Sequence, residues 1–248
     1  MTALRIAIVD DEPPARMVLR EYLEQEQGIA IVAECANGFE AVKAVAEQKP
    51  DLLILDVQMP KLDGFEVLEL VGHDTAVIFA TAYDEYALRA FDVHAVDYLL
   101  KPFSRERLHD ATERARQRLA RGEHTATGAS DLSAAARPAG TRLARIVIRD
   151  GADVHVVPIE RVDYIEAQDD YIAVHTGGRT LLKDQTMANV EAQLDPRRFV
   201  RIHRSFLLNL DRLARIQATG KDTRAAVPRD GRELPVSRTG YARLQELL

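Results

Sequence analysis

An unbroken run of four apolar residues, 52–55, leads directly into the carboxylate of Asp56. Because apolar and polar residues do not alternate in this run, it is typical of a strand that is buried on both faces of a parallel sheet. In open α/β folds, ligands bind beyond the carboxyl ends of such strands. The sequence therefore places Asp56 at a candidate functional edge, although an Asp at the end of a strand can also be a helix cap or a turn former.

The same pattern recurs along residues 1–120, where short apolar runs alternate with segments of helical periodicity. The predicted strands are residues 4–9, 29–35, 52–55, 77–80 and 98–100, and the predicted helices are residues 15–26, 39–48, 65–70, 86–93 and 105–119. This alternation predicts a doubly wound α/β domain with a parallel sheet. Five polar residues that follow its strands would meet at one edge: Asp10, Asp11, Asp56, Thr81 and Lys101.

Clustered carboxylates repel one another, which raises their pKa values unless a cation neutralises them. Mg2+ binds such oxygen ligands and leaves coordination positions open for a phosphoryl group. With Asp10 and Asp11 binding the metal, Asp56 could act as a nucleophile on phosphorus. Lys101 could then pair with the phosphoryl oxygens, and Thr81 could donate its hydroxyl to one of them.

Four motifs of the first half, VDDEPPAR, LILDVQMPKLDG, FATAYDEYALRAF and DYLLKPF, resemble the receiver domain of two-component response regulators. The resemblance covers residues 4–119 and implies a flavodoxin-like fold and a cis peptide bond before Pro102. It also implies the following roles: phosphoacceptor Asp56, Mg2+ ligands Asp10, Asp11, Asp56 and the Gln58 backbone carbonyl, phosphate-pairing Lys101, and switch residues Thr81 and Tyr98.

Two other classes of α/β protein fit the first half poorly. A dinucleotide-binding fold would have a G-x-G-x-x-G motif after its first strand, where this chain has acids and prolines. A phosphatase with an aspartate nucleophile would have a second acid in a D-x-D pattern, and Gln58 occupies that position.

The chain changes in composition after the first domain. Residues 121–141 have no sustained apolar face, and they contain several glycines together with Ser130 and Pro138. This composition predicts a flexible connector. We therefore expect a receiver domain at 1–120, a linker at 121–141 and a second domain at 142–248.

Short β-rich runs separated by turns dominate the second half. The predicted strands are residues 146–148, 154–157, 162–165, 171–174, 180–182, 199–202, 206–208, 213–216, 224–227 and 233–236, and residues 187–194 form the predicted helix. The pattern predicts a mostly-β module in which Gly177-Gly178 closes a hairpin. No catalytic motif is evident: Ser205 lacks a G-x-S-x-G context, and the histidines lack metal-ligand spacing. We therefore expect a binding module and not an enzyme.

Charge differs between the two halves. Residues 1–118 carry 13 Lys or Arg and 22 Asp or Glu, whereas residues 141–248 carry 18 and 15. Several arginines of the second half lie in predicted turns, where they could pair with phosphates or read guanine in the major groove. A polyanion is therefore a candidate partner for this half, although the charges could also form a solvated face.

Three segments of the second half, DYIEAQDDYIAVHT, FVRIHRSFLLNLDRL and LPVSRTGY, resemble the LytTR DNA-binding domain over residues 143–248. The resemblance implies that turns of the module enter major grooves of DNA. Arg201 and His203 could equally be packed or hydrogen-bonded framework. The candidate DNA-binding residues are Arg204, Arg238, Lys183, Arg201, His203, Asp170 and Tyr171.

These features together predict a transcription regulator of a two-component system. A histidine kinase would phosphorylate Asp56 with the help of Mg2+, and the chain would dimerise and bind promoter DNA. The alternative is a receiver joined to a protein- or RNA-binding module. The N-terminal apolar run is too short for a signal peptide and no run would span a bilayer, so a cytoplasmic location is expected.

Overall fold

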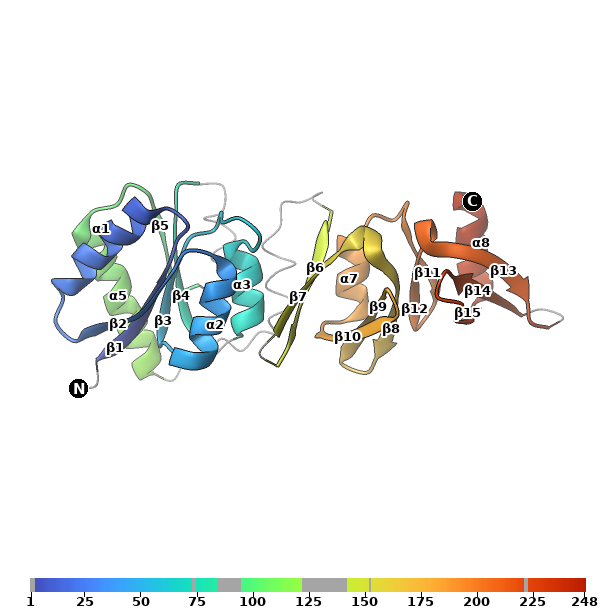
Figure 1. Cartoon of the computed structure of the whole chain (residues 1–248), viewed down its shortest axis with the longest axis horizontal. Coiled ribbons are helices and arrows are strands. Elements are labelled where there is room, and N and C mark those ends of the chain that lie inside the picture. Colours follow the sequence, from blue (N-terminus) through green and yellow to red (C-terminus); the bar gives the residue numbers. More distant parts are fainter. Residues whose placement is uncertain (1–2, 73–74, 84–94, 122–141, 152, 221–222) are drawn as a thin grey trace. The chain divides into compact units, whose positions relative to one another are not determined.

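The computed structural model describes residues 3–72, 75–83, 95–121, 142–151, 153–220 and 223–248 (Figure 1). The chain forms two compact units, Met1–Arg137 and Pro138–Leu248, and each is described by itself. The helix predicted at 86–93 and the linker predicted at 121–141, apart from Arg121, lie outside the described residues.

The first unit is built on a five-stranded sheet with the strand order β2-β1-β3-β4-β5, in which all pairs are parallel. Its strands are β1 (Leu4–Val9), β2 (Ile29–Cys35), β3 (Leu52–Leu55), β4 (Ala76–Thr81) and β5 (Asp97–Leu100). Its helices are α1 (Pro13–Glu24), α2 (Gly38–Gln48), α3 (Gly64–Val71) and α5 (Arg105–Ala120). The predicted doubly wound α/β fold is confirmed.

Helices cover both faces of this sheet. Figure 1 shows α1 and α5 on one face and α2 and α3 on the other. The first pair packs through Leu19, Leu23 and Leu108 against the β1 and β3 side chains Ile8 and Ile54. All four residues of β3 are buried, as its unbroken apolar run predicts.

The register of the parallel strands aligns their carboxyl ends at one edge of the sheet. Val9 lies opposite Leu55 in the β1–β3 pair, and Leu55 lies opposite Phe79 in the β3–β4 pair. At the far side, Thr81 is paired with Leu100 of β5. The residues that leave β1, β3, β4 and β5 are therefore neighbours in space.

The described residues of the second unit form three antiparallel sheets, and the central one has the strand order β10-β9-β8-β12-β11. The central strands are β8 (Val162–Gln168), β9 (Tyr171–Thr176), β10 (Arg179–Asp184), β11 (Phe199–His203) and β12 (Phe206–Asn209). The flanking strands are β6 (Arg145–Asp150), β7 (Asp153–Pro158), β13 (Leu213–Ala218), β14 (Arg224–Pro228) and β15 (Leu234–Val236). The helices are α7 (Met187–Gln193) and α8 (Arg238–Leu247), with 3₁₀ turns η2 (Ile159–Arg161) and η3 (Leu210–Arg212).

Both faces of the central sheet are buried, and alternate residues of β8 show how. Ile165 packs into a cluster with β6, β7 and Val190 of α7. Tyr164 points to the other face and packs with Leu234 of β15 and Leu244 of α8. Because side chains alternate along a strand, one strand serves both cores. The predicted mostly-β module is confirmed.

The C-terminal helix α8 was not among the predicted elements. Ser237 is its N-cap and accepts a hydrogen bond from the backbone N–H of Gly240 (3.0 Å). Gly240 allows α8 to approach β11, because a Cβ atom at this position would lie 2.0 Å from the backbone oxygen of Ile202. The close contact fixes the N-terminus of α8 beside the end of β11.

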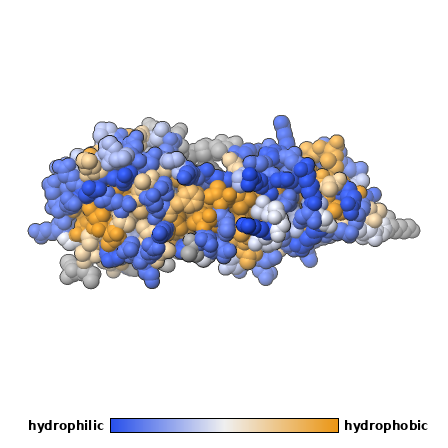
Figure 2. Space-filling model, viewed as in Figure 1, coloured by the Kyte–Doolittle hydropathy of each residue, from blue (hydrophilic) through white to orange (hydrophobic). Residues whose placement is uncertain are grey.

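Large apolar side chains gather in these clusters, and hydrophilic residues cover much of the face shown in Figure 2. Some large apolar residues are nevertheless exposed, among them Met17 and Leu182. None of the helices that the structure describes has the length and apolar character needed to cross a membrane.

Candidate metal centre and nucleic-acid interface

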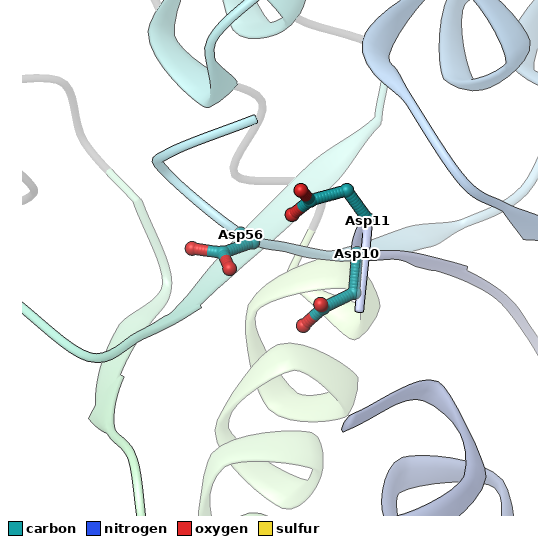
Figure 3. Close-up of side chains that lie close together, drawn as sticks. All are labelled: Asp10, Asp11 and Asp56. Carbon is teal, nitrogen blue, oxygen red and sulfur yellow. The ribbon is translucent and has the colours of Figure 1, made fainter. Parts of the chain in front are cut away.

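Three carboxylates lie together at the carboxyl edge of the first sheet. Asp10 and Asp11 follow β1 and Asp56 follows the neighbouring strand β3, as Figure 3 shows. Asp10 is fully buried and Asp56 is nearly so. One carboxylate oxygen from each residue lies within 4.8 Å of the other two. The predicted convergence of Asp10, Asp11 and Asp56 is therefore present.

Backbone contacts hold these acids in place. The backbone N–H of Asp56 donates to the carbonyl of Val9 (2.9 Å), which extends the β1–β3 pairing by one residue. The backbone N–H of Gln58 donates to Asp56 Oδ1 (3.2 Å). Arg16 of α1 donates from its guanidinium to the backbone carbonyl of Asp10 (2.6 Å). The backbone at Asp10 and Asp56 is thus tied to neighbouring elements of the fold.

Lys101 brings a positive charge to the same place from the end of β5. Its Nζ lies 2.5 Å from Asp10 Oδ2 and 2.9 Å from Asp56 Oδ2, and its side chain is 17% exposed. The following peptide bond, Lys101–Pro102, is cis, as the resemblance implied. The predicted convergence of Lys101 on the acidic edge is therefore present, and the structure adds its ion pairs with Asp10 and Asp56.

Burial shapes the electrostatics of this cluster. Burial raises the pKa of Asp10 above its ordinary value, even though hydrogen bonding to Lys101 opposes the shift. Burial alone would lower the pKa of Lys101, but its hydrogen bonds to Asp10 and Asp56 raise the pKa above the ordinary value. One ammonium faces three carboxylates, so the site retains an excess of negative charge that a cation could offset.

Thr81 lies at the end of β4, beside this cluster, and is fully buried. Its hydroxyl has no hydrogen-bond partner among the described residues. A buried hydroxyl without a hydrogen-bond partner lowers the stability of the fold. The Thr81 hydroxyl could therefore gain a hydrogen bond by donating to an acceptor that enters the site. Tyr98 of β5 is half-buried and donates its hydroxyl to the backbone carbonyl of Tyr83, two residues beyond Thr81.

Gly64 is a residue of this site that sequence reasoning missed. A Cβ atom on Gly64 would lie 2.4 Å from the backbone oxygen of Asp56, so a larger residue would displace the loop that carries the carboxylate. Its backbone N–H donates to Val57 (2.8 Å). The Asp63-Gly64 pair signals a turn in the sequence, but only the structure shows how close the backbone approach is.

In the second unit, two turns meet at one end of the central sheet. The turn after β8 contains Asp170, and the turn after β11 contains Arg204. These turns are neighbours because β8 pairs with β12, and the N–H of Ala167 donates to the carbonyl of Ser205 (2.9 Å). Tyr171 begins β9 at the same end and is 49% exposed.

A hollow of about 380 Å3 opens beside the β11–β12 turn. The residues that line it come from the β11–β12 segment and from α8: Arg201, His203, Arg204, Ser237, Thr239, Gly240 and Arg243. Three arginines and the N-terminus of a helix make this surface attractive to anions. Arg238, the first residue of α8, lies in sequence between the lining residues Ser237 and Thr239.

The remaining candidate residues differ in their surroundings. The backbone N–H of Ser205 donates to the Nδ1 atom of His203 (3.2 Å), so this ring bonds within its own turn. Lys183 lies on β10, at the edge of the central sheet opposite β11. Its Nζ donates to the backbone carbonyl of Val147 (2.6 Å). The structure therefore does not bring Lys183 to the hollow.

Comparisons with known proteins identify both units. The model of the response regulator receiver domain matches residues 6–113, and that of the LytTr DNA-binding domain matches residues 152–248. An uncharacterized response regulatory protein from Yersinia pestis is 36% identical over 99% of this chain and 98% of its own length. The transcriptional regulatory protein BtsR from Escherichia coli is 33% identical and the sensory transduction protein LytT from Bacillus subtilis is 32% identical, each over 99% of both chains.

Proposed function

Because this chain belongs to the response regulators that join a receiver domain to a LytTR DNA-binding domain, we propose that phosphorylation of Asp56 controls its binding to promoter DNA. The phosphoryl donor in this proposal is a histidine kinase, the partner that a receiver domain implies. The observation that carries the proposal is the meeting of Asp56 with Lys101 and two further acids at one edge of the first sheet.

The acidic cluster fits Mg2+ by its chemistry. Its three carboxylate oxygens are hard ligands that lie close enough together to bind one ion. We propose Asp10, Asp11, Asp56 and the backbone carbonyl of Gln58 as the ligands. When bound, Mg2+ would supply positive charge that offsets the repulsion between the carboxylates and the phosphoryl oxygens.

The chemical step requires little beyond positioning. An oxygen of Asp56 attacks the phosphorus of the phosphohistidine, the new P–O bond forms as the P–N bond breaks, and an aspartyl phosphate results. Lys101 already lies 2.9 Å from Asp56 Oδ2, and it would pair with an oxygen of the transferred group. Its positive charge would therefore stabilise the negative charge that is spread over the phosphoryl oxygens during transfer.

Thr81 and Tyr98 are the proposed switch residues. The buried hydroxyl of Thr81, which has no partner within the described parts of the chain, can donate to a phosphoryl oxygen. Movement of Thr81 would shift the segment that follows β4, where the carbonyl of Tyr83 accepts the hydrogen bond from Tyr98. Phosphorylation would thereby change the surface around β5.

At the DNA-binding unit, we propose Arg204 and Arg238 as readers of base edges. Arg204 is exposed in the β11–β12 turn, and Arg238 begins α8 beside it. Asp170 and Tyr171 lie at the same end of the sheet, where they could contact neighbouring bases. Lys183 could contact a phosphate only at the opposite edge, after it releases the carbonyl of Val147.

We further propose that phosphorylated receivers pair, so that two DNA-binding units occupy adjacent half-sites. Linking two modest sites raises the overall affinity through the effective concentration of the second site. The distance between half-sites would then follow the symmetry of the dimer.

Selection from random duplex DNA tests this proposal. The full chain, phosphorylated by a small phosphodonor with Mg2+, should enrich a repeated sequence motif, and the unphosphorylated chain should enrich it less. A parallel selection from random RNA tests the alternative of an RNA-binding output. Enrichment of RNA without enrichment of any duplex motif would contradict the proposal.

A further inference from the structure

The β11–β12 turn is held by side chains that bind its carbonyl groups. The carbonyl of Ile202 accepts hydrogen bonds from the N–H (2.8 Å) and the Oγ (3.0 Å) of Ser237. The carbonyl of His203 accepts one from Nε of Arg201 (2.8 Å). The carbonyl of Arg204 accepts another from a terminal nitrogen of Arg201. Three successive peptide groups are thus fixed from outside the turn.

This external support compensates for a gap in the strand pairing. The register of β11 with β12 shifts between Arg201 and His203, so Ile202 has no partner residue in the β11–β12 ladder. Such bulges redirect the side chains that follow them. Here the carbonyl of Ile202 is turned toward Ser237 of the α8 N-cap instead. The direction of the turn therefore depends on Arg201 and Ser237 as well as on the sheet, which holds the turn through the hydrogen bond from Ala167 to Ser205.

Arg201 is itself anchored by an acid from another element. Its Nη1 lies 2.9 Å from Oε2 of Glu191 on α7, and its side chain is 20% exposed, whereas Arg204 is exposed. The guanidinium thus makes bonds to two carbonyls and one carboxylate. A planar guanidinium can make these bonds together because its donors form a rigid fork, which an ammonium lacks.

We propose that Arg201, anchored by Glu191, is a positioning residue that sets the β11–β12 turn so that Arg204 meets base edges at the required angle. The inference rests on the proposed DNA-binding function of the second unit. Bidentate reading of a base depends on the direction of the guanidinium plane, so a small rotation of the turn is enough to weaken it. Arg201 then acts through the turn and not through its own contact with DNA.

Glu191→Gln tests this inference because positioning and simple electrostatics predict opposite signs. Removing an acid near DNA strengthens phosphate attraction, whereas loss of the Arg201 anchor should weaken specific binding. We expect about a tenfold loss of affinity for the duplex enriched by the wild-type chain, which is ~1.4 kcal/mol. Affinity for a shuffled duplex of equal length should not fall. Glu246→Gln on α8 makes the same charge change and should show no specific loss.

Arg201→Lys separates the two roles further, since it keeps the charge and removes the fork. It should weaken specific binding at least as much as Glu191→Gln and leave the salt dependence unchanged. Glu191→Asp, which keeps a carboxylate on α7, should restore part of the specific affinity. Thermal unfolding of each variant shows whether the second unit remains folded, and partly exposed Glu191 offers the milder substitution.

Two results would overturn the inference while leaving the proposed function intact. One is wild-type specific affinity in both Arg201→Lys and Glu191→Gln. The other is a loss in Arg201→Gln that is equal on specific and shuffled duplexes and lowers the salt slope by about one, as expected for a phosphate contact. If the wild-type chain enriches no duplex sequence, the proposed function fails and the inference fails with it.

Discussion

The ammonium group of Lys101 lies 2.9 Å from the carboxylate of Asp56, although 45 residues separate them in the chain. The same ammonium lies 2.5 Å from Asp10, so it occupies two of the three carboxylates that could bind a metal. Lys101 and a divalent cation therefore compete for the same negative charge.

This competition predicts that Lys101→Met raises the affinity of the chain for Mg2+. The gain should be about three- to tenfold, because one positive charge beside the ligands is removed. Phosphorylation by a small phosphodonor should nevertheless slow, since the variant cannot pair with the phosphoryl oxygens. Titration calorimetry with Mg2+ measures the first effect. Lys43→Met on the exposed face of α2 is the matched control, and weaker Mg2+ binding by Lys101→Met would contradict the competition.

Thr81→Val should separate stability from signalling. The Thr81 hydroxyl is buried without a partner in the described structure, so its removal should raise the free energy of unfolding of the first unit by about 1 kcal/mol. Phosphorylation should no longer increase DNA affinity in this variant. Denaturant unfolding and DNA titration measure the two effects.

Thr112→Val is the matched control for this change. Thr112 is equally buried, but its hydroxyl donates to the carbonyl of His109 (2.8 Å), so its removal should lower stability by about 1 kcal/mol. Equal destabilisation in both variants would show that the Thr81 hydroxyl has a partner.

The first domain and its acidic edge could be predicted from sequence because the relevant signals are local. The unbroken apolar run of β3 identified a parallel sheet, and the residue after each strand identified the edge. The sequence did not show how closely the segments around Asp56 pack against one another. The closeness of Gly64 to the Asp56 backbone and the double contact of Lys101 depend on packing between segments far apart in the chain.

The second domain was harder to predict, for a physical reason. Its contacts depend on which strands pair, and pairing is not visible in short β runs. Lys183 was grouped with Arg204 by charge, yet the strand order places β10 and β11 at opposite edges of the sheet. Helix α8 was missed because its signal is short, consisting of the Ser237 cap and the apolar residue Leu244. The bonds of Arg201 to the turn favour the framework alternative that the sequence left open for this residue.

Because His175 is buried, we expect the second unit to lose stability in acid. The ring is buried, stacks on Tyr164 at 4.2 Å and lies 3.0 Å from Glu166. Burial lowers the pKa of His175 below its ordinary value of 6.5, although Glu166 opposes the shift. The unfolded chain therefore binds a proton before the folded chain does. Stability is present above pH 6.5 and is lost as the pH falls through the folded pKa.

His175→Phe keeps the stacking and removes the titration, so it should flatten this part of the pH dependence. Melting temperatures of the wild type and the variant between about pH 8 and pH 5 measure the difference. An identical acid dependence in both proteins would assign the effect to other groups.

Arg204→Ala and Arg238→Ala should each weaken binding to the specific duplex by about 1–3 kcal/mol if these residues read bases. Binding to a shuffled duplex should change less. Arg179→Ala is a matched control, because Arg179 begins β10 at the opposite end of the central sheet. Equal losses on both duplexes would make Arg204 and Arg238 phosphate contacts. Competition binding at two salt concentrations distinguishes these outcomes.

In the proposed function Asp56 carries the phosphoryl group, and labelling of the full chain tests this assignment most directly. With Mg2+ and a small phosphodonor, the wild-type chain should gain one phosphoryl group that is stable in acid and labile in base, and Asp56→Asn should gain none while melting at a similar temperature. Mass spectrometry of the intact protein measures both. The same Mg2+-dependent, base-labile label on Asp56→Asn would contradict the account.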